Sequence, residues 1–156
     1  MDENSLIDGM CIMNTELDRF EIRIFISLPM SGRPDEDVQA DIARAKEQAS
    51  DYFNSIFEKL ELERYPELVF VDTFAQDPAP SGMVNPNLHY LGHSVQVLGT
   101  CSFIWFVKGW NKARGCTIER EISKLYNIPS FYESMYLRLK KHEEDVLKNE
   151  QPEVMG

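Results

Sequence analysis

The sequence predicts an α/β protein in which a mostly parallel sheet of four or five strands lies between two layers of helices. Two observations lead to this prediction. Segments typical of strands alternate with segments typical of helices along the whole chain, which is the pattern of a parallel sheet with helical crossovers. The strand segments are also apolar on both faces, as in CSFIWFV, so helices are expected to cover the sheet on both sides.

The first strand is predicted at about 21–27, where the apolar run in FEIRIFISLPMSG ends in a Pro/Gly turn. Pro34 and three following acids are typical of a helix start. The helix that they begin has seven apolar residues on one face, namely Val38, Ile42, Ala45, Ala49, Phe53, Ile56 and Leu60.

The second strand is predicted at about 67–73, in ELVFVDTF, and the proline-rich loop AQDPAPSGMVNPN follows it. Structureless loops of this length are often functional. The third strand is CSFIWFV and the short fourth strand is IPSFYE. Three more helices are predicted, and their apolar positions are Leu88, Leu91, Val95 and Leu98, then Ile118, Ile122 and Leu125, then Tyr136, Leu139 and Val146.

Residues 20–150 are expected to form a single domain, preceded by a poorly defined leader at 1–19 and followed by a tail at 151–156, since 156 residues suit one core. No apolar run approaches the roughly 20 residues that span a bilayer. The N-terminus lacks the pattern of a signal peptide. Three cysteines without C-x-x-C spacing indicate neither a disulfide framework nor a zinc site. We therefore expect a cytoplasmic protein with no membrane contact, no metal and no cofactor.

The charge distribution indicates a small anionic ligand rather than a nucleic acid. The net charge of −10 argues against general binding to DNA or RNA. However, the 41 residues from Pro78 to Ile118 contain no Asp or Glu, and they carry Lys108, Lys112 and Arg114. A site for an anionic small molecule would explain this segregation. The alternative is that the stretch is mainly core helix and strand.

Three segments would line the edge of the sheet where ligands bind, beyond the carboxyl ends of the parallel strands. They are SLPMSG, the proline-rich loop and KGWNKARG. In SLPMSGRP, Ser27 and Gly32 precede a helix, so the turn could offer N–H groups to a phosphate or sugar. The alternative is an ordinary turn between a strand and a helix, because the segment matches neither nucleotide-binding glycine motif.

Glu119 is the candidate reactive carboxylate. It falls in the first or second turn of the helix that begins near Gly115. The helix dipole, Lys112 and Arg114 are expected to favour its ionised form, which a nucleophile requires. Glu121 lies about 200° further around the helix, so only one of the two can face a cleft. The alternative is a favourable charge at a helix start and nothing more.

Other polar and aromatic residues near these segments allow two interpretations each. Trp110 could stack on a base or pack in the core. Tyr90 could enter the pocket or pack. His89 and His93 have the i, i+4 spacing of metal ligands, but no acid lies near them, so we expect no metal site.

Four segments, IFISLPMSG, NPNLHYLGHSVQVL, FVKGWNKARGCTIEREI and YNIPSFYE, together resemble the nucleoside 2-deoxyribosyltransferase-like superfamily. The resemblance is to a branch of small bacterial and phage proteins of unknown function, and it covers about 23–133. The third segment is similar to the family pattern Gly-Trp…Ser/Ala-x-Gly-Ala/Cys-x-x-Glu.

This resemblance implies a flavodoxin-like, or Rossmann-like, three-layer sandwich and chemistry at an N-glycosidic bond. Glu119, four residues beyond Gly115, would attack C1′ of a 2-deoxyribosyl group, and a second base or water would resolve the glycosyl-enzyme. Ser27, Ser31 and Gly32 correspond to phosphate-binding positions. The other expected substrate-binding residues are Met30, Tyr90, Lys108, Gly109, Trp110, Lys112, Arg114 and Gly115. The resemblance also implies a homo-oligomer, for which the final amphipathic helix is a candidate interface unless its apolar stripe is core.

Three departures from the family pattern bear on the reaction. Phe25 stands where transferases usually carry a Tyr that orients the carboxylate, Ser102 stands where an Asp is usual, and Leu28 replaces a glycine. These departures favour a nucleotide hydrolase or a nucleotide-binding protein over a base-exchange enzyme. Three hypotheses follow: an enzyme acting on N-glycosidic bonds, a non-catalytic nucleotide-binding module, and a protein-interaction domain.

Overall fold

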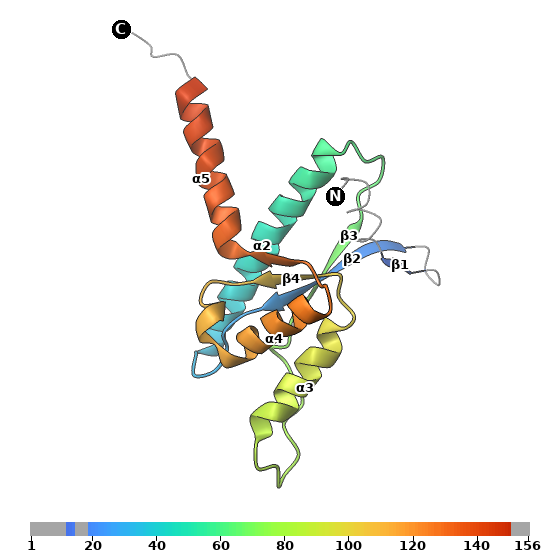
Figure 1. Cartoon of the computed structure of the whole chain (residues 1–156), viewed down its shortest axis with the longest axis vertical. Helices are drawn as coiled ribbons and strands as arrows, with labels where there is room; N and C mark the ends of the chain where they lie inside the picture. Colours follow the sequence, from blue (N-terminus) through green and yellow to red (C-terminus); the bar gives the residue numbers. More distant parts are fainter. Residues whose placement is uncertain (1–11, 15–18, 151–156) are drawn as a thin grey trace.

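A central sheet lies between two layers of helices in the computed structural model, which describes residues 12–14 and 19–150 (Figure 1). This arrangement confirms the predicted α/β three-layer sandwich. The strands are β1 (Ile12–Asn14), β2 (Arg19–Ser27), β3 (Glu67–Val71), β4 (Phe103–Phe106) and β5 (Ser130–Tyr132). The helices are α2 (Asp35–Lys59), α3 (Pro86–Leu98), the 3-10 turn η1 (Trp110–Lys112), α4 (Arg114–Leu125) and α5 (Glu133–Glu150).

Four strands run parallel in the order β3-β2-β4-β5, and β1 pairs antiparallel with the first residues of β2. This order places β2 between the strand that follows it and the third strand, as in flavodoxin-like sheets. The carboxyl ends of β2 and β4 therefore meet at the point where a ligand crevice is expected. β1 belongs to the predicted leader, while the rest of that leader and the tail at 151–156 lie outside the described residues.

One face of the sheet packs against α2 and α5. Ile22, Ile24 and Ile26 of β2 point to this side, and Phe53 of α2 stacks on Phe103 with ring centroids 5.3 Å apart. The predicted apolar face of α2 is confirmed up to Phe53. Its last turn differs from the prediction, because Phe57 is fully buried there, while Ile56 and Leu60 are only partly buried.

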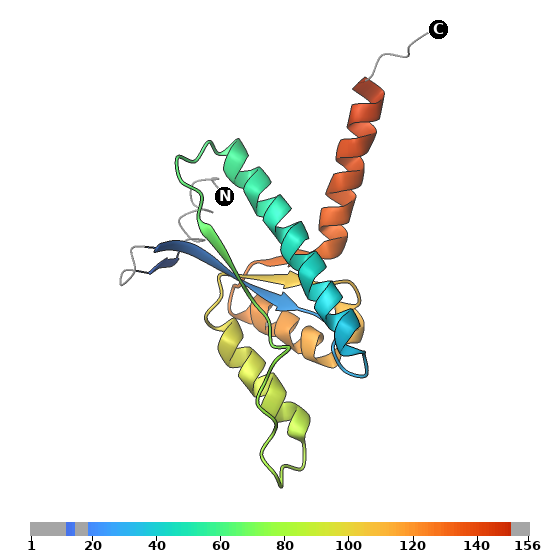
Figure 2. The same ribbon diagram turned by 180° about the vertical axis from the view of Figure 1, so that it is seen from behind.

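The opposite face packs against α3 and α4 (Figure 2). Phe25, Ile104 and Phe106 of the strands form a core here with Leu98 of α3. The prediction for α4 was wrong at Leu125, which is 75% exposed.

The face of α4 that lies against the sheet is formed by Cys116, Glu119 and Ser123, all of which are buried. Their spacing of three and four residues places them on one side of the helix, and Ile118 and Ile122 lie beside that side, partly buried. The helix thus turns small and polar residues toward the sheet, so its apolar periodicity alone predicts the wrong face.

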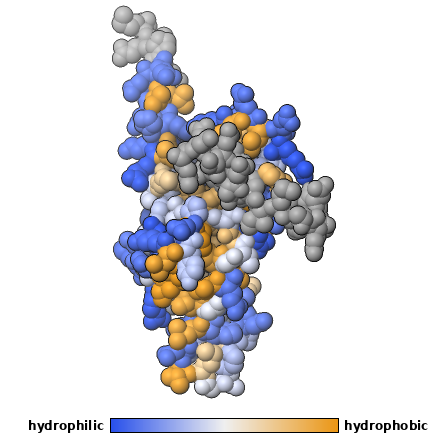
Figure 3. All heavy atoms as spheres, turned by 45° about the vertical axis from the view of Figure 1, so that its right-hand side comes forward, coloured by the Kyte–Doolittle hydropathy of each residue, from blue (hydrophilic) through white to orange (hydrophobic). Residues whose placement is uncertain are grey.

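Two parts of the chain project from the sandwich (Figures 1 and 2). α5 extends away from the sheet, and its residues from Lys141 to Glu150 are all exposed. The proline-rich loop and the first half of α3 form the second projection, where apolar atoms reach the surface (Figure 3) at Met83, Val84 and Leu88. Among the described helices, none has the length and apolar composition required to cross a membrane.

Candidate functional site

The site is built around Glu119, in the second turn of α4, and Ser27, the last residue of β2. Both side chains are buried, with 6% and 1% exposure. The Ser27 hydroxyl donates a 2.8 Å hydrogen bond to Oε1 of Glu119. The backbone N–H of Val107 donates to the carbonyl of Ser27 over 2.9 Å, which joins the ends of β2 and β4 at the same place. Glu119 therefore lies at the point in the sheet where ligands of this fold are expected.

The pKa of Glu119 is raised to about 7, because burial disfavours the charged carboxylate. The hydrogen bond from Ser27 acts in the opposite direction, but burial outweighs it. The expectation that Lys112, Arg114 and the helix start keep this group strongly ionised was therefore wrong. The two cations are exposed, and neither forms a salt bridge within the described chain, whereas Glu119 points inward against the sheet.

Cys116 is the third buried polar group of the site, one helical turn before Glu119. Its side chain is 3% exposed. Burial raises the pKa of the thiol to about 12, the Ser27 hydroxyl opposes this shift, and the charge of Glu119 adds to it. Cys116 is therefore a protonated, weakly reactive thiol rather than a second nucleophile. The i, i+3 spacing of Cys116 and Glu119 was a signal for this grouping that the apolar pattern of α4 concealed.

The loops after β2 and β4 meet at Pro29 and Gly109. Gly109 has a φ of +90°, a left-handed conformation that favours glycine, and a Cβ there would lie 3.5 Å from Cγ of Pro29. Met30 packs against the α2 side of the core, whereas Ser31 and Gly32 form an exposed turn in which Gly32 has a φ of +72°. The turn is thus exposed to solvent, whereas Ser27 at the end of the preceding strand is buried.

A chain of ion pairs fixes the loop after β2. Arg33 donates to the carbonyl of Pro29 over 2.8 Å and pairs with Asp41 of α2 over 2.8 Å. Asp41 also pairs with Arg44 over 2.6 Å, and Arg44 forks onto both oxygens of Glu133 over 3.1 and 3.2 Å. Burial disfavours the ionised form of Asp41, but the hydrogen bonds from Arg33 and Arg44 outweigh it and lower its pKa.

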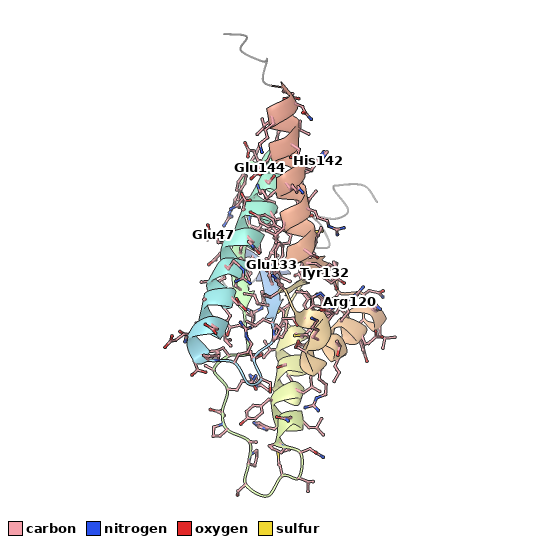
Figure 4. The ribbon with its side chains drawn as sticks, turned by 90° about the vertical axis from the view of Figure 1, so that its left-hand side faces the viewer. Glu47, Arg120, Tyr132, Glu133, His142 and Glu144 are labelled. Carbon is pink, nitrogen blue, oxygen red and sulfur yellow. The ribbon has the colours of Figure 1, made fainter. Side chains whose placement is uncertain are left out.

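This chain of four side chains ends at the base of α5, where Figure 4 shows Glu133 between the sheet and α2. Sequence reasoning singled out none of the four residues. Arg44 and Glu133 are 89 residues apart, and no periodic pattern relates them. The only local signal was the i, i+3 spacing of Asp41 and Arg44.

Two predicted ligand-binding residues have structural contacts instead of a free side chain. The Tyr90 hydroxyl accepts a 3.1 Å hydrogen bond from the backbone N–H of Ala79, so it ties the proline-rich loop to α3. Trp110 packs on Phe106 and Tyr132, with centroid distances of 5.0 and 5.5 Å, and is only partly buried. Trp110 therefore packs in this structure, as the second interpretation expects.

The cationic candidates lie on the segment from the end of β4 to the start of α4. Lys108 follows β4, Lys112 ends η1, and Arg114 and Gly115 begin α4. All four residues are exposed, and no ion pair of the described residues includes any of the three cations. Their charges are therefore available to an anionic ligand at the surface next to Glu119.

The hydroxyl that contacts Glu119 comes from a different residue than the family pattern suggests. Phe25 is fully buried in the core on the α3 and α4 side and has no polar group to offer. Ser27 lies two residues further along β2, on the same face of the strand, and supplies the hydroxyl. The hydroxyl of Ser102 is buried, and no hydrogen-bond partner for it lies in the described part of the chain.

Two depressions in the surface of the described residues both leave out Glu119. One, of about 430 Å³, lies between α4 and β5 and includes Arg120, Lys124 and Tyr132, and the other lies along α5. Within residues 12–14 and 19–150, no three His, Cys, Asp or Glu side chains are grouped so that they could hold a metal ion. Glu119 thus lies beneath a closed surface.

No protein-family model matches this sequence, and neither the curated proteins nor the solved structures give a significant match. The resemblance to nucleoside 2-deoxyribosyltransferases is therefore still a prediction, and the geometry around Glu119 has to carry the functional argument.

Proposed function

We propose that this protein cleaves the N-glycosidic bond of a 2-deoxynucleoside or its 5′-monophosphate, with Glu119 as the reacting carboxylate. The observation that carries the proposal is a buried carboxylate that has no cationic partner among residues 12–14 and 19–150. Its one hydrogen bond within the described residues comes from the Ser27 hydroxyl. Burying such a group costs stability, and carboxylates of this kind concentrate at functional sites.

The chemistry requires only the groups at this edge of the sheet. With a pKa of about 7, a substantial fraction of Glu119 is ionised at neutral pH. The carboxylate attacks C1′, the C1′–N bond breaks, and the base leaves with the bonding electrons and takes up a proton. Water or a second base then attacks C1′ and releases Glu119 as a carboxylate. Because Ser27 holds Oε1, Oε2 is the oxygen available for attack.

The surface next to Glu119 supports a phosphorylated substrate. Ser31 and Gly32 form an exposed turn ahead of α2, and Lys112 and Arg114 are exposed near the start of α4. Backbone N–H groups at helix starts and nearby cations bind phosphate. Because Glu119 is only 6% exposed, the surface over it has to open for C1′ to reach it.

We place this activity in the cytoplasm, in a homo-oligomer. Cys101 and Cys116 are free, buried thiols, which is usual in a reducing compartment. The exposed apolar side chains of α5 support self-association.

The test is a panel of deoxynucleosides and their 5′-monophosphates, followed by chromatography of the released base. We expect the wild type to release base, and Glu119→Ala to lower the rate at least about 1,000-fold, as loss of a nucleophile does. The matched control is Glu121→Ala, which removes an exposed carboxylate two residues away and should leave the rate unchanged. If Glu119→Ala releases base as fast as the wild type, Glu119 is not the nucleophile.

A second candidate is a nucleotide-binding module without turnover. The closed surface over Glu119, which is 6% exposed, and the apolar residue at Phe25 favour it. On this hypothesis, calorimetry shows binding of monophosphates while no base is released. Absence of nucleotide binding by wild-type protein would remove both candidates and favour a protein-interaction domain.

A further inference from the structure

The depression of about 430 Å³ between α4 and β5 is separate from the Glu119 site. Arg120 lines it, and consecutive residues of a helix point about 100° apart. Arg120 therefore faces a different side of α4 from Glu119, whose carboxylate bonds to Ser27 at the end of β2. A depression of this volume is large enough for a small molecule.

The end of α4 shapes this depression. After Leu125, the last residue of the helix, Asn127 has a φ of +57°, and the N–H of Ile128 donates to the carbonyl of Ser123 over 2.9 Å. A left-handed residue just beyond a helix reverses the chain in this way. The reversal brings β5 back beside α4, with the hydroxyl oxygens of Ser123 and Ser130 3.0 Å apart. The second half of α4 and β5 thus form the two walls of the depression.

The guanidinium of Arg120 is held in place on the first wall. Its Nη1 donates to the hydroxyl of Ser123 over 3.1 Å, and Ser123 is buried. Its central carbon lies 5.8 Å from the centre of the Tyr132 ring, and Figure 4 shows the two residues next to each other. A guanidinium over an aromatic ring is attracted to it. Arg120 is therefore oriented before any ligand binds.

The charge of Arg120 has no counter-charge in this position. Arg33 and Arg44 are also partly buried, and each pairs with an acid. No ion pair within residues 12–14 and 19–150 includes Arg120, although the chain has a net charge of −10. Lys124 lines the same depression, but it pairs with Glu121 over 3.4 Å. The depression therefore has one uncompensated positive charge.

The second wall adds a backbone donor and apolar surface. The N–H of Ile104 in β4 donates to the carbonyl of Pro129 over 3.1 Å, so the next residue, Ser130, directs its own N–H away from β4. β5 is the last strand on this side of the sheet, so this N–H points to a free edge. Ile128 and Pro129 line the depression with apolar atoms.

We propose that this depression binds the carboxylate of a small acid with an apolar body. Two N–H groups of Arg120 pair with the two carboxylate oxygens, the geometry that a guanidinium favours. The N–H of Ser130 is a further donor, and Ile128 and Pro129 contact the apolar body. One uncompensated positive charge suits a monoanion better than a phosphate monoester, which carries a charge of about −1.5 to −2 at neutral pH. The inference is independent of the reaction proposed for Glu119.

The first experiment is an NMR titration of the full chain with benzoate at constant ionic strength. We expect saturable shifts of the Ser130 amide and the Arg120 Nε–H signals, with a dissociation constant of about 1 mM. Benzamide, the neutral analogue of the same shape, should bind at least about tenfold more weakly, because it cannot pair with the charge of Arg120. Shifts that do not saturate, or equal binding of the two compounds, would overturn the proposal.

Substitutions then separate Arg120 from the general charge of the surface. Arg120→Gln should weaken benzoate binding at least about tenfold, and Arg120→Lys, which keeps the charge but not the planar guanidinium, should weaken it several-fold. Lys124→Gln is the matched control, since it removes a cation from the same depression, and it should change binding less than about twofold. Equal weakening by Arg120→Gln and Lys124→Gln would contradict a site built on Arg120.

Other anions test the class of ligand. Acetate lacks the apolar body, and inorganic phosphate carries more charge, so both should bind at least about tenfold more weakly than benzoate at the same ionic strength. Tighter binding of phosphate would assign the depression to a phosphorylated ligand and contradict the carboxylate assignment. Glu119→Ala should bind benzoate as the wild type does, whether or not the wild type releases base. Loss of benzoate binding in Glu119→Ala would show that the two sites are not separate.

Discussion

Glu119 and Glu133 are both buried carboxylates in helices that border the sheet, yet their surroundings differ. Glu133 is 3% exposed, and both of its oxygens accept hydrogen bonds from Arg44. Glu119 is 6% exposed, and its partner is the neutral hydroxyl of Ser27. A guanidinium compensates the buried charge of Glu133, whereas no group of opposite charge among the described residues compensates that of Glu119.

The comparison separates a structural role from a functional one. A buried carboxylate that pairs with Arg and connects two helices is explained by the fold. A buried carboxylate that burial holds at a pKa of about 7 destabilises the folded state at neutral pH, so the fold does not explain it. The functional proposal depends on this difference.

The largest expected effect is on the pH dependence of stability. The pKa of Glu119 is about 7 in the folded state, against an ordinary value of 4.5 for a solvated Glu. Below pH 4.5 the group is protonated in both states, and above 7 it is ionised in both, so stability falls as pH rises between these values. At 1.36 kcal/mol per pKa unit, the loss is about 3 kcal/mol.

Glu119→Gln should therefore gain about 3 kcal/mol of unfolding free energy relative to the wild type between pH 4.5 and 8. Urea denaturation across this range measures the difference. Glu121→Gln, at an exposed position, should track the wild type at every pH. A constant difference for the Glu119 variant would show that the carboxyl group has an ordinary pKa.

The next effect concerns Glu133. Glu133→Gln breaks the paired hydrogen bonds with Arg44 and should lower the unfolding free energy by about 2 kcal/mol at neutral pH, the opposite sign to Glu119→Gln. Glu121→Gln breaks an exposed pair with Lys124 and should cost less than about 0.5 kcal/mol. Equal losses from the two substitutions would mean that the buried ion-pair chain contributes no more than a surface pair.

Ser27→Ala tests the one hydrogen bond that Glu119 has. Because this bond lowers the pKa of Glu119, its removal should shift the rise of base release with pH upward by about one unit. Ser31→Ala, in the exposed turn, is the control for the midpoint only, since it is expected to change KM. An unshifted midpoint in Ser27→Ala would show that another group controls the profile.

The smallest expected effect concerns the exposed cations. Lys112→Ala or Arg114→Ala should weaken binding of a deoxynucleoside monophosphate about five-fold, and leave binding of the unphosphorylated deoxynucleoside unchanged. Calorimetry measures both. Lys124→Ala, at the other end of α4, is the control for loss of a surface charge. Equal weakening with both ligands would place the phosphate elsewhere.

The layers and most helix and strand positions could be predicted because they follow from local periodicity. The buried face of α4 could not be predicted in this way. It consists of Cys116, Glu119 and Ser123, and a search for apolar periodicity does not detect small and polar residues. The predicted direction of the Glu119 pKa shift was also wrong. Neighbouring cations are visible in the sequence, whereas the depth to which a side chain is buried depends on packing against a distant strand.

The ion-pair chain shows the same limit for long-range contacts. Arg33, Asp41 and Arg44 lie close together in sequence, but Glu133 reaches them only because β5 and the start of α5 return beside α2. Neither composition nor residue spacing predicts an ion pair between residues so far apart in the sequence. The sequence therefore indicated Glu119 as a candidate, whereas the ion-pair chain that fixes the loop after β2 was found only in the structure.

Trapping the glycosyl-enzyme tests the central claim most directly. A 2′-fluorinated deoxynucleotide slows breakdown of the intermediate, because fluorine destabilises the oxocarbenium-like transition state. Trypsin cuts after Arg120, so GCTIER carries Glu119 and EISK carries Glu121 in separate peptides. We predict that mass spectrometry finds the sugar on GCTIER alone. Base release with the sugar on another peptide would contradict Glu119 as the nucleophile.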